Sequence, residues 1–267
     1  MKKYIVSIIT LLVFIGCAYT SSTQSGTVGV ERKQLMLLSS SDMQKGANEA
    51  YGTILAKAKK EGTLNTNKNT LQRLQTISKR LIQQTPTFRK DALTWKWEVN
   101  LIKEDTLNAW CMPGGKIAFY TGIIDKLHLS DGEIAAIMGH EISHALREHG
   151  RERASQQQLT NMGLQLVGAY FKLDTKLSSL AQKVTDVTLT LPNSRAHETE
   201  ADRMGVELAA RAGYNPYDAV NVWKKMAKLS NNKVPEILST HPAHDTRIDD
   251  LNIYAKKVNA LYLQVKK

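Results

Sequence analysis

Apolar and polar residues alternate along this chain mainly at the spacing of amphipathic helices. Residues 39–60 begin with helix-capping Ser and Asp and continue with helical periodicity, and residues 71–83 repeat apolar side chains every three or four positions. Residues 95–99 instead alternate as a strand does, and β-forming residues at 116–120 follow a Pro-Gly-Gly turn. A small sheet of about three strands is therefore expected after two helices.

From residue 121 onward the pattern is almost entirely helical. The sequence Ser-Asp-Gly-Glu at residues 130–133 matches a capping box and predicts a helix that runs to about residue 149. Further helices are expected in residues 155–190, 194–212 and 217–229, and at the C-terminal end. Because no internal repeat or linker interrupts residues 31–267, this stretch is predicted to be one α+β domain that is mostly helical.

The first sixteen residues (1–16) are predicted to be a signal peptide. Lys2 and Lys3 precede an apolar run at residues 4–15, which is too short to span a hydrocarbon core of about 30 Å. Residues 14–17, Phe-Ile-Gly-Cys, resemble the bacterial lipobox, which implies cleavage before Cys17 and lipid on that cysteine. The alternative is an ordinary signal peptide that is cleaved nearby, with Cys17 incidental.

The residues after the expected cleavage site bear on location. Ala18 stands there and not Asp, which by resemblance to the Gram-negative sorting rule implies the periplasmic face of the outer membrane. Residues 17–30 would then form the lipidated cysteine and a flexible tether, because the stretch is rich in Ser, Thr and Gly and carries no charge.

Composition narrows the choice of function. The chain has 267 residues with 42% hydrophobic residues, which is typical of a globular protein, and its two cysteines exclude a disulfide scaffold. The formal net charge is +11, but the positive residues are dispersed and no motif for reading bases occurs. No nucleic-acid partner is therefore expected, and Cys111 is predicted to be a buried thiol.

Two histidines on one predicted helix carry the clearest chemistry. His140 and His144 lie four positions apart, so both imidazoles face one side of the helix, as a tetrahedral zinc ion requires from a rigid element. Glu141 follows the first histidine and is placed to reach water at the metal. The alternative is a helix that holds two histidines by chance, but the surrounding apolar residues indicate a buried helix, in which unpaired imidazoles need partners.

A catalytic zinc site needs a third protein ligand. His149 lies about 140° around a continuous helix from His144 and is excluded on that ground. Glu198 and Asp202 share one face of a second helix, so the first is predicted to bind zinc and the second to accept the N–H of a ligand histidine. A fourth position is left open for water, as in hydrolytic zinc sites. Glu200 points about 200° away from Glu198 and is predicted to be solvated.

Four stretches together resemble the gluzincin metallopeptidase family that includes the CAAX prenyl protease, HtpX and the periplasmic BepA-like and LoiP-like proteases. They are residues 108–122, 140–144, 194–202 and 240–248, and the resemblance covers about residues 35–255. It implies a zincin-type metallopeptidase domain at 31–267 with one zinc ion per chain. The expected absence of later membrane spans and of a helical-repeat tail makes the single-domain LoiP-like lipoproteins most similar in plan.

The resemblance also implies roles for single residues. Glu141 would take a proton from the attacking water and return one to the leaving amine. His241, in a His-Pro segment, would either donate to the developing oxyanion or close onto the zinc as a fourth ligand of a latent state. His244 is a weaker candidate for both roles, and a loop-capping role is the alternative for His241. Arg247 would steady this segment by ion pairing.

The stretch that holds Asn108, Ala109 and Trp110 resembles the substrate-edge strand of the family. Such a strand binds an extended chain through main-chain hydrogen bonds, which implies unfolded or misassembled proteins as substrates. The leading hypothesis is thus a zinc endopeptidase, lipid-anchored in the bacterial envelope, that hydrolyses such envelope proteins. The alternative is a lipoprotein chaperone or assembly factor with a latent or weakly active site.

Some residues have no assigned role at this point. The apolar stretch from Leu159 to Phe171 fits a lid, a partner surface or core, with core as the default expectation. His128 and His197 are predicted to be surface or packing residues.

Overall fold

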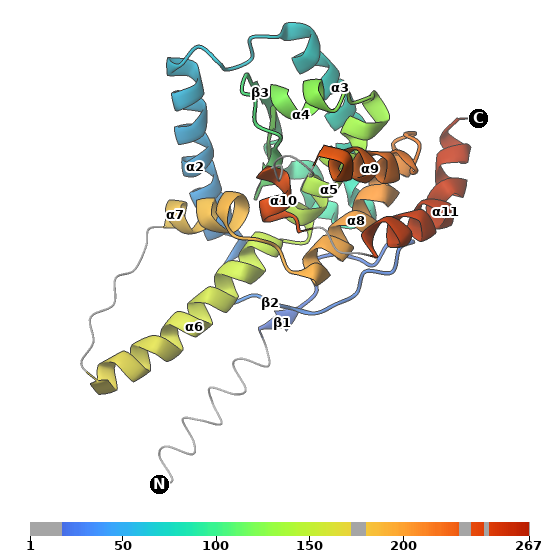
Figure 1. The fold of residues 1–267 in the computed structure, drawn as a ribbon. Coiled ribbons are helices and arrows are strands. Elements are labelled where there is room, and N and C mark those ends of the chain that lie inside the picture. Colours follow the sequence, from blue (N-terminus) through green and yellow to red (C-terminus); the bar gives the residue numbers. More distant parts are fainter. Residues whose placement is uncertain (1–17, 172–179, 230–235, 243–245, 267) are drawn as a thin grey trace.

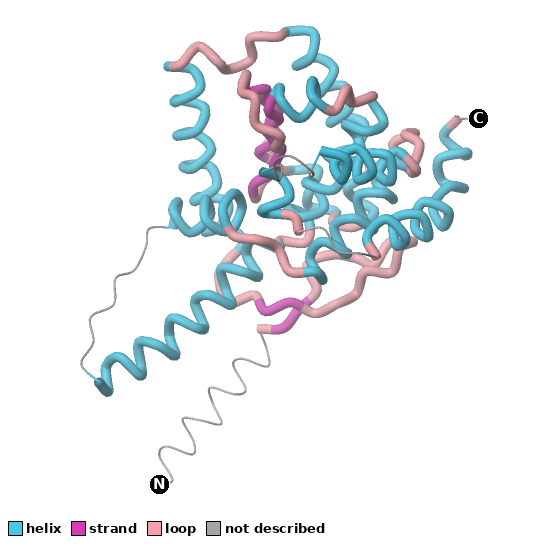
Figure 2. The backbone as a smooth tube through the Cα atoms, in the orientation of Figure 1, coloured by secondary structure: helices cyan, strands magenta, loops and turns pink. Residues whose placement is uncertain are grey.

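Helices make up most of the structure (Figures 1 and 2). The computed structural model describes residues 18–171, 180–229, 236–242 and 246–266, so the predicted signal peptide, Cys17 and His244 lie outside the described residues. The helices are α2 Ser40–Lys60, α3 Lys68–Ile82, α4 Thr121–Lys126, α5 Asp131–Leu146, α6 His149–Phe171, α7 Leu180–Thr185, α8 Arg195–Arg211, α9 Asp218–Leu229, α10 Glu236–Thr240 and α11 Arg247–Val265. Shorter turns are the 3-10 helices Thr85–Thr87 and Lys90–Thr94 and the π-helix Asp186–Thr190. The prediction of a mostly helical domain is confirmed.

The predicted three-stranded sheet is present. It consists of β3 Glu98–Ile102, β4 Ala109–Met112 and β5 Lys116–Tyr120 in the order β3-β5-β4, with β3 parallel and β4 antiparallel to β5. The first strand starts three residues later than the alternation at 95–99 predicts. Ahead of the strand, the rings of Trp95 and Trp97 stack on each other, and Trp97 packs over the β4–β5 turn, where a Cβ on Gly115 would lie 2.6 Å from its ring.

The N-terminal segment, residues 18–38, is part of the folded domain, and the prediction of a flexible tether is wrong for its described part. β1 Tyr19–Thr20 pairs with β2 Gln34–Leu35, and Val28 and Val30 are buried in the main core. The backbone N–H groups of Thr27 and Val28 donate to the carboxylate of Glu207 on α8 at 3.1 and 3.0 Å. The composition of this segment does not predict the docking. Burial of two valines and hydrogen bonds to one buried carboxylate stabilise the folded segment more than its many Ser and Gly residues favour a flexible one.

Helix α5 runs through the middle of the fold and packs against α8, α9, α3 and β4. The predicted capping box is present: Ser130 accepts a hydrogen bond from the N–H of Glu133 and its own N–H donates to the carboxylate of Glu133. Every residue from position 133 to 146 is buried. A buried, capped helix at the centre is a rigid mount for the side chains that it carries.

The central helix ends earlier than its pattern predicts. α5 stops at Leu146 and α6 starts at His149, because Glu148 adopts a left-handed backbone with φ of 52°. Figure 1 shows α6 projecting from the body of the fold, and Met162 in its outer part is exposed. The default expectation of core for the stretch from Leu159 is therefore wrong at this residue. In the part of the chain that the structure describes, no helix is both long and apolar enough for a membrane span.

Candidate zinc site

The two helix histidines point into one space, as predicted. Nε2 of His140 and Nε2 of His144 lie 3.0 Å apart, and both side chains are nearly buried. Nδ1 of His140 lies 2.9 Å from Oδ1 of Asp202, so His140 donates its Nδ1 proton there and offers the lone pair of Nε2. The contact has the geometry that the sequence predicts for this pair, in which the carboxylate would hold the histidine in one tautomer.

Helix α8 brings an acidic donor to the same space. Ser194 caps this helix by accepting the N–H of His197 at 3.2 Å. One turn in, the carboxylate of Glu198 lies 3.5 Å from Nε2 of His140 and 3.4 Å from Nε2 of His144, and it is fully buried. The structure thus brings together the three predicted ligand side chains.

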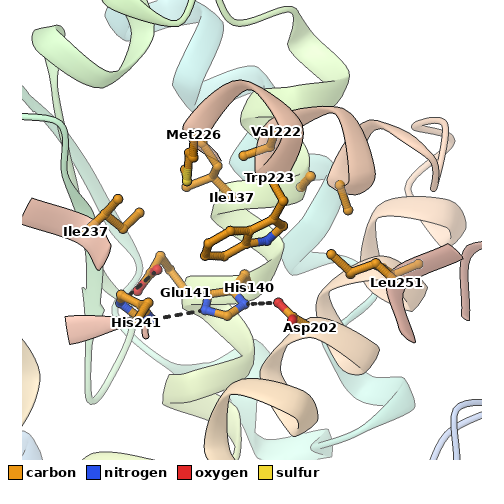
Figure 3. A pocket seen from close by; sticks show the side chains of 13 residues that line it. Ile137, His140, Glu141, Asp202, Val222, Trp223, Met226, Ile237, His241 and Leu251 are labelled. Carbon is orange, nitrogen blue, oxygen red and sulfur yellow. Dashed lines mark hydrogen bonds and ion pairs between the residues drawn. The ribbon is translucent and has the colours of Figure 1, made fainter. Parts of the chain in front are cut away.

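A fourth donor comes from the segment after α10. Nδ1 of His241 lies 3.1 Å from Nε2 of His140 and 3.1 Å from Oε1 of Glu198, and its Nε2 lies 3.5 Å from Oε1 of Glu141 (Figure 3). The segment is held by Asn193, whose backbone N–H donates to the carbonyl of Thr240 at 2.9 Å. His241 is therefore buried among the donors and does not merely cap a loop.

The donor set fits a zinc ion. One atom from each of His140, His144, Glu198 and His241 can be chosen so that all four lie within 4.8 Å of one another. Ligands about 2.0–2.1 Å from a tetrahedral centre stand about 3.3–3.4 Å apart, which is close to the separations found here. In addition, Oε1 of Glu141 is buried without a hydrogen-bond partner among the described residues. Two imidazole lone pairs that face each other are costly unless a cation joins them.

Arg247 was predicted to steady only its own segment. In the structure it also supports the acidic side of the cluster. Its guanidinium lies 2.9 Å from Oε2 of Glu198 and 2.7 Å from Oδ2 of Asp202, and it stacks 3.4 Å above the ring of Trp223. It also donates to the carbonyl of Pro242 at 3.4 Å, which retains a link to the His-Pro segment. One buried cation thus serves two carboxylates and the segment that carries the fourth donor.

Burial and charge shape the protonation of the cluster. Burial raises the pKa of Glu141, although His241 and His140 oppose this, and burial lowers the pKa of His144 well below its ordinary value. Burial alone would raise the pKa of Glu198, but His241, His144 and Arg247 hold that pKa well below its usual range. A carboxylate beside a neutral imidazole is the protonation state in which both groups bind metal.

Of three further residues near the cluster, one was predicted wrongly from the sequence. Glu200 is buried and not solvated: its carboxylate bonds to Arg147 and His149 at 3.1 and 2.9 Å. His149 is not a ligand, as predicted, but its Nδ1 lies 2.8 Å from Nδ1 of His144 because the break at Glu148 redirects the chain. His197 is buried, as one of the two predicted options, and its ring stacks on that of His149 with centroids 4.4 Å apart. The one signal of this burial in the sequence was that many charged residues lie beside apolar residues on these helices.

The predicted substrate strand lies at the edge of the sheet. Among the described strands, β4 has β5 on one side only, and Asn108, Ala109 and Trp110 are all buried. Cys111 is buried as predicted, and burial raises the pKa of its thiol. A cavity of about 30 Å³ between the end of β4 and α5 is lined by Cys111 and Glu141 among others. The edge strand therefore lies beside the donor cluster.

A second cavity of about 30 Å³ adjoins the cluster on the other side (Figure 3). Its walls are apolar and include Ile137, Trp223 and Met226, while His140 and Glu141 form its polar end. Cavities of this size hold one or two water molecules and no peptide. Neither of these two cavities has room for an extended chain.

Two histidines one helical turn apart, an acidic donor from a second helix and a glutamate beside the first histidine define the zinc metallopeptidase class. The chain belongs to peptidase family M48, whose sequence model matches residues 68–255. Its four-residue donor cluster fits one zinc ion. The resemblance found in the sequence is confirmed.

Relatives come from mitochondria and from bacteria. Mitochondrial metalloendopeptidase OMA1 of Arabidopsis thaliana is 38% identical over 151 residues, which covers 57% of this chain and 30% of the relative. OMA1 of Saccharomyces cerevisiae is 32% identical over 177 residues, covering 63% and 50%. The beta-barrel assembly-enhancing protease of Escherichia coli strain K12 is 28% identical over 174 residues, covering 61% and 35%. The aligned part thus spans between about a third and a half of these relatives.

Proposed function

We propose that this chain is a zinc-dependent metalloendopeptidase that is lipid-anchored in the bacterial envelope and hydrolyses misfolded or misassembled envelope proteins. The observation that carries the catalytic part is the position of Glu141, whose unpartnered Oε1 lies beside the cluster of His140, His144 and Glu198. The name of the bacterial relative supports an envelope substrate, whereas the OMA1 relatives are named as mitochondrial.

The proposed chemistry assigns a task to each side chain. His140, His144 and Glu198 would hold zinc, which supplies Lewis acidity that polarises a peptide carbonyl and makes water a better nucleophile at neutral pH. Glu141 takes the proton of the attacking water and later gives a proton to the leaving amine. Asp202 keeps His140 in the tautomer that offers Nε2, and Arg247 keeps both carboxylates ionised.

Substrate binding is assigned to the edge strand. An extended chain that pairs with β4 is recognised through its backbone, so it needs to be unfolded rather than to carry one particular sequence. The buried side chains of Asn108, Ala109 and Trp110 would hold this strand in register with the sheet while its edge receives the substrate. Because both cavities at the site are water-sized, binding requires that the segment around His241 moves away.

A latent state is favoured by the position of His241. Four protein donors would fill a tetrahedral zinc shell, as in structural sites, and would leave no position for water. We therefore assign His241 as the fourth ligand in this conformation, and an oxyanion-donor role would need it to leave. The same observation favours the second candidate function, a lipoprotein chaperone or assembly factor whose protease site is latent.

Digestion of reduced casein by residues 18–267 tests the catalytic assignment. The unsubstituted chain, Glu141→Gln and His241→Ala are compared, and the zinc content of each sample is measured. We expect zinc in all three, cleavage by the unsubstituted chain, faster cleavage by His241→Ala, and none by Glu141→Gln. Cleavage by Glu141→Gln at the unsubstituted rate would overturn the assignment of the base, and zinc without cleavage in every sample would favour the chaperone function.

The anchor is tested separately. The full chain is expressed in a Gram-negative bacterium beside Cys17→Ser, and envelope fractions are probed for the protein and for incorporated labelled palmitate. We expect the label and the outer-membrane fraction for the unsubstituted chain only. Label-free protein in the soluble fraction from both chains would refute lipid anchoring and leave the catalytic assignment untouched.

A further inference from the structure

His144 is contacted from behind by a histidine that the proposed mechanism does not use. Nδ1 of His149 lies 2.8 Å from Nδ1 of His144, and Nε2 of His149 lies 2.9 Å from Oε2 of Glu200. His149 itself is completely buried, so water does not compete for either contact. The three side chains form a continuous row that leads away from the donor cluster.

The proton positions along this row follow from the metal site. If His144 offers Nε2 to zinc, its proton is on Nδ1, and it donates to Nδ1 of His149. His149 then has its own proton on Nε2 and donates it to Glu200. Each donor in the row then faces an acceptor. The row thus accepts the Nδ1 proton of His144, as Asp202 directly accepts the Nδ1 proton of His140.

Two arginines hold the carboxylate at the end of the row. Arg147 lies 3.1 Å from Oε2 of Glu200, and Nε of Arg32 lies 2.7 Å from Oε1. Arg32 belongs to the N-terminal segment and also bonds to Glu152 on α6 at 2.5 and 2.8 Å. Arg147 in turn donates to the carbonyl of Arg32 at 2.7 Å.

The N-terminal segment is therefore in contact with the row at several points. Arg147 also donates to the hydroxyls of Ser21 and Thr23, at 3.0 and 3.1 Å, and its own carbonyl accepts from the amide of Gln34 at 2.7 Å. These contacts join residues 18–38 to the C-terminal end of α5, two turns or less from the metal ligands. A row that is fixed at both ends restricts the rotation of the imidazole of His144.

We propose that His149 and Glu200 are positioning residues for the zinc ligand His144, and that Arg32 makes the docked N-terminal segment part of the support of the metal site. This proposal rests on the proposed zinc ligands. Among those ligands, His144 is the one that contacts the added row, through His149. It predicts that substitutions in the row change zinc affinity even where they leave the ligands intact. Outer partners of metal ligands typically contribute about 10–100-fold to affinity.

The test compares two replacements of His149 in the full chain. His149→Asn places an amide oxygen where Nδ1 was and so retains an acceptor for His144, whereas His149→Phe keeps a ring to stack on His197 but has no acceptor. Zinc dissociation constants are measured by competition with a chromogenic chelator, and the absorption spectrum of the cobalt-substituted protein reports the ligand geometry. We expect about 10–100-fold weaker zinc binding and an altered cobalt spectrum for His149→Phe, and a smaller loss for His149→Asn.

Arg32 provides a second test, at a position where the side chain is partly exposed. Arg32→Gln is expected to weaken zinc binding and Arg32→Lys to restore part of it, since Lys keeps a cation near Glu200. The matched controls are His128→Gln, which removes an exposed histidine, and Lys225→Met, which removes an ion pair of 2.7 Å with Glu133 at the opposite end of α5. Both controls are expected to bind zinc as the unsubstituted chain does.

The outcomes separate this proposal from the proposed function. Equal zinc affinity for the unsubstituted chain, His149→Phe and Arg32→Gln would overturn the positioning role alone. An equal loss for His149→Phe and His149→Asn would overturn it too, because the acceptor would then be irrelevant. An unsubstituted chain that binds no zinc would overturn the proposed metal site and this inference together.

Discussion

Gly139 and Gly205 face each other where α5 crosses α8. A Cβ on Gly205 would lie 2.7 Å from the backbone nitrogen of His140, and a Cβ on Gly139 would lie 2.9 Å from the carbonyl oxygen of Gly205. The two helices therefore approach almost backbone to backbone. This close approach brings the carboxylates of Glu198 and Asp202 within reach of the histidines on α5.

The close crossing of α5 and α8 predicts that a side chain at position 205 is poorly tolerated. Gly205→Ala should separate the helices, lower the free energy of unfolding by about 1–3 kcal/mol, and weaken zinc binding because Glu198 is displaced. Urea unfolding and a zinc titration measure the two effects. The control is Gly52→Ala in α2, where no atom lies within 4 Å of the added methyl and a gain of about 0.5–1 kcal/mol is expected. Equal zinc affinity for the unsubstituted protein and Gly205→Ala would refute this explanation of the crossing.

Arg247 should matter most when the metal is absent. Arg247→Gln leaves two buried carboxylates without their cation, so the metal-free protein is expected to lose about 3–5 kcal/mol of stability, and the zinc-loaded protein less. Unfolding curves with zinc and with chelator give both values. Arg203→Gln is the control, because its ion pair with Asp250 is partly exposed and is worth about 0–1 kcal/mol. The same loss in both metal states would contradict the proposed charge balance.

Docking of the N-terminal segment should weaken as the pH falls into the acid range. Burial alone would raise the pKa of Glu152, but hydrogen bonds from Arg32, His197 and Gln34 outweigh it and hold this pKa well below the ordinary value of 4.5. A depressed pKa in the folded state means stabilisation that is complete above the unfolded pKa and is lost as the pH falls below it. We expect the unfolding free energy to fall with decreasing pH below about 4.5, and less steeply in Glu152→Gln. Parallel pH profiles for the two proteins would exclude this contribution.

Metal removal should destabilise the whole domain. The donors come from α5, α8 and the segment after α10, so zinc joins three elements, and free zinc at about a hundred times its dissociation constant should add about 2.7 kcal/mol. Scanning calorimetry before and after chelation measures this, with recovery on adding zinc back. In His140→Ala the chelator should have a much smaller effect. A chelator-insensitive melting temperature in the unsubstituted protein would argue against the site.

Local spacing was sufficient for much of the site. His140 and His144 share a face in any regular helix, and the same rule puts Glu198 and Asp202 together. The capping box located the start of the metal helix, and alternation located the sheet to within a few residues. These features depend on neighbours three or four positions apart, which the sequence shows directly.

The same reasoning missed contacts where the chain departs from regular geometry or where another segment packs on a helix. His149 was placed by assuming that its helix continues, but the left-handed backbone at Glu148 turns its ring onto His144. Glu200 was placed in solvent from its angle to Glu198, because nothing in the local pattern shows that the N-terminal segment covers that side of α8 with Arg32. Helical angles describe one element and not the elements that pack on its other face.

The sequence by itself determined the class of protein, since two histidines, a glutamate and a later acidic pair repeat at intervals set by helix geometry. Only the tertiary structure decided that His241 joins the donors, that Arg247 neutralises Glu198 and Asp202, and that residues 18–38 are folded against the metal helix. Each of these contacts joins residues at least 43 positions apart in the chain. Their formation depends on how helices and segments pack and on which charges that packing buries, and local periodicity contains neither.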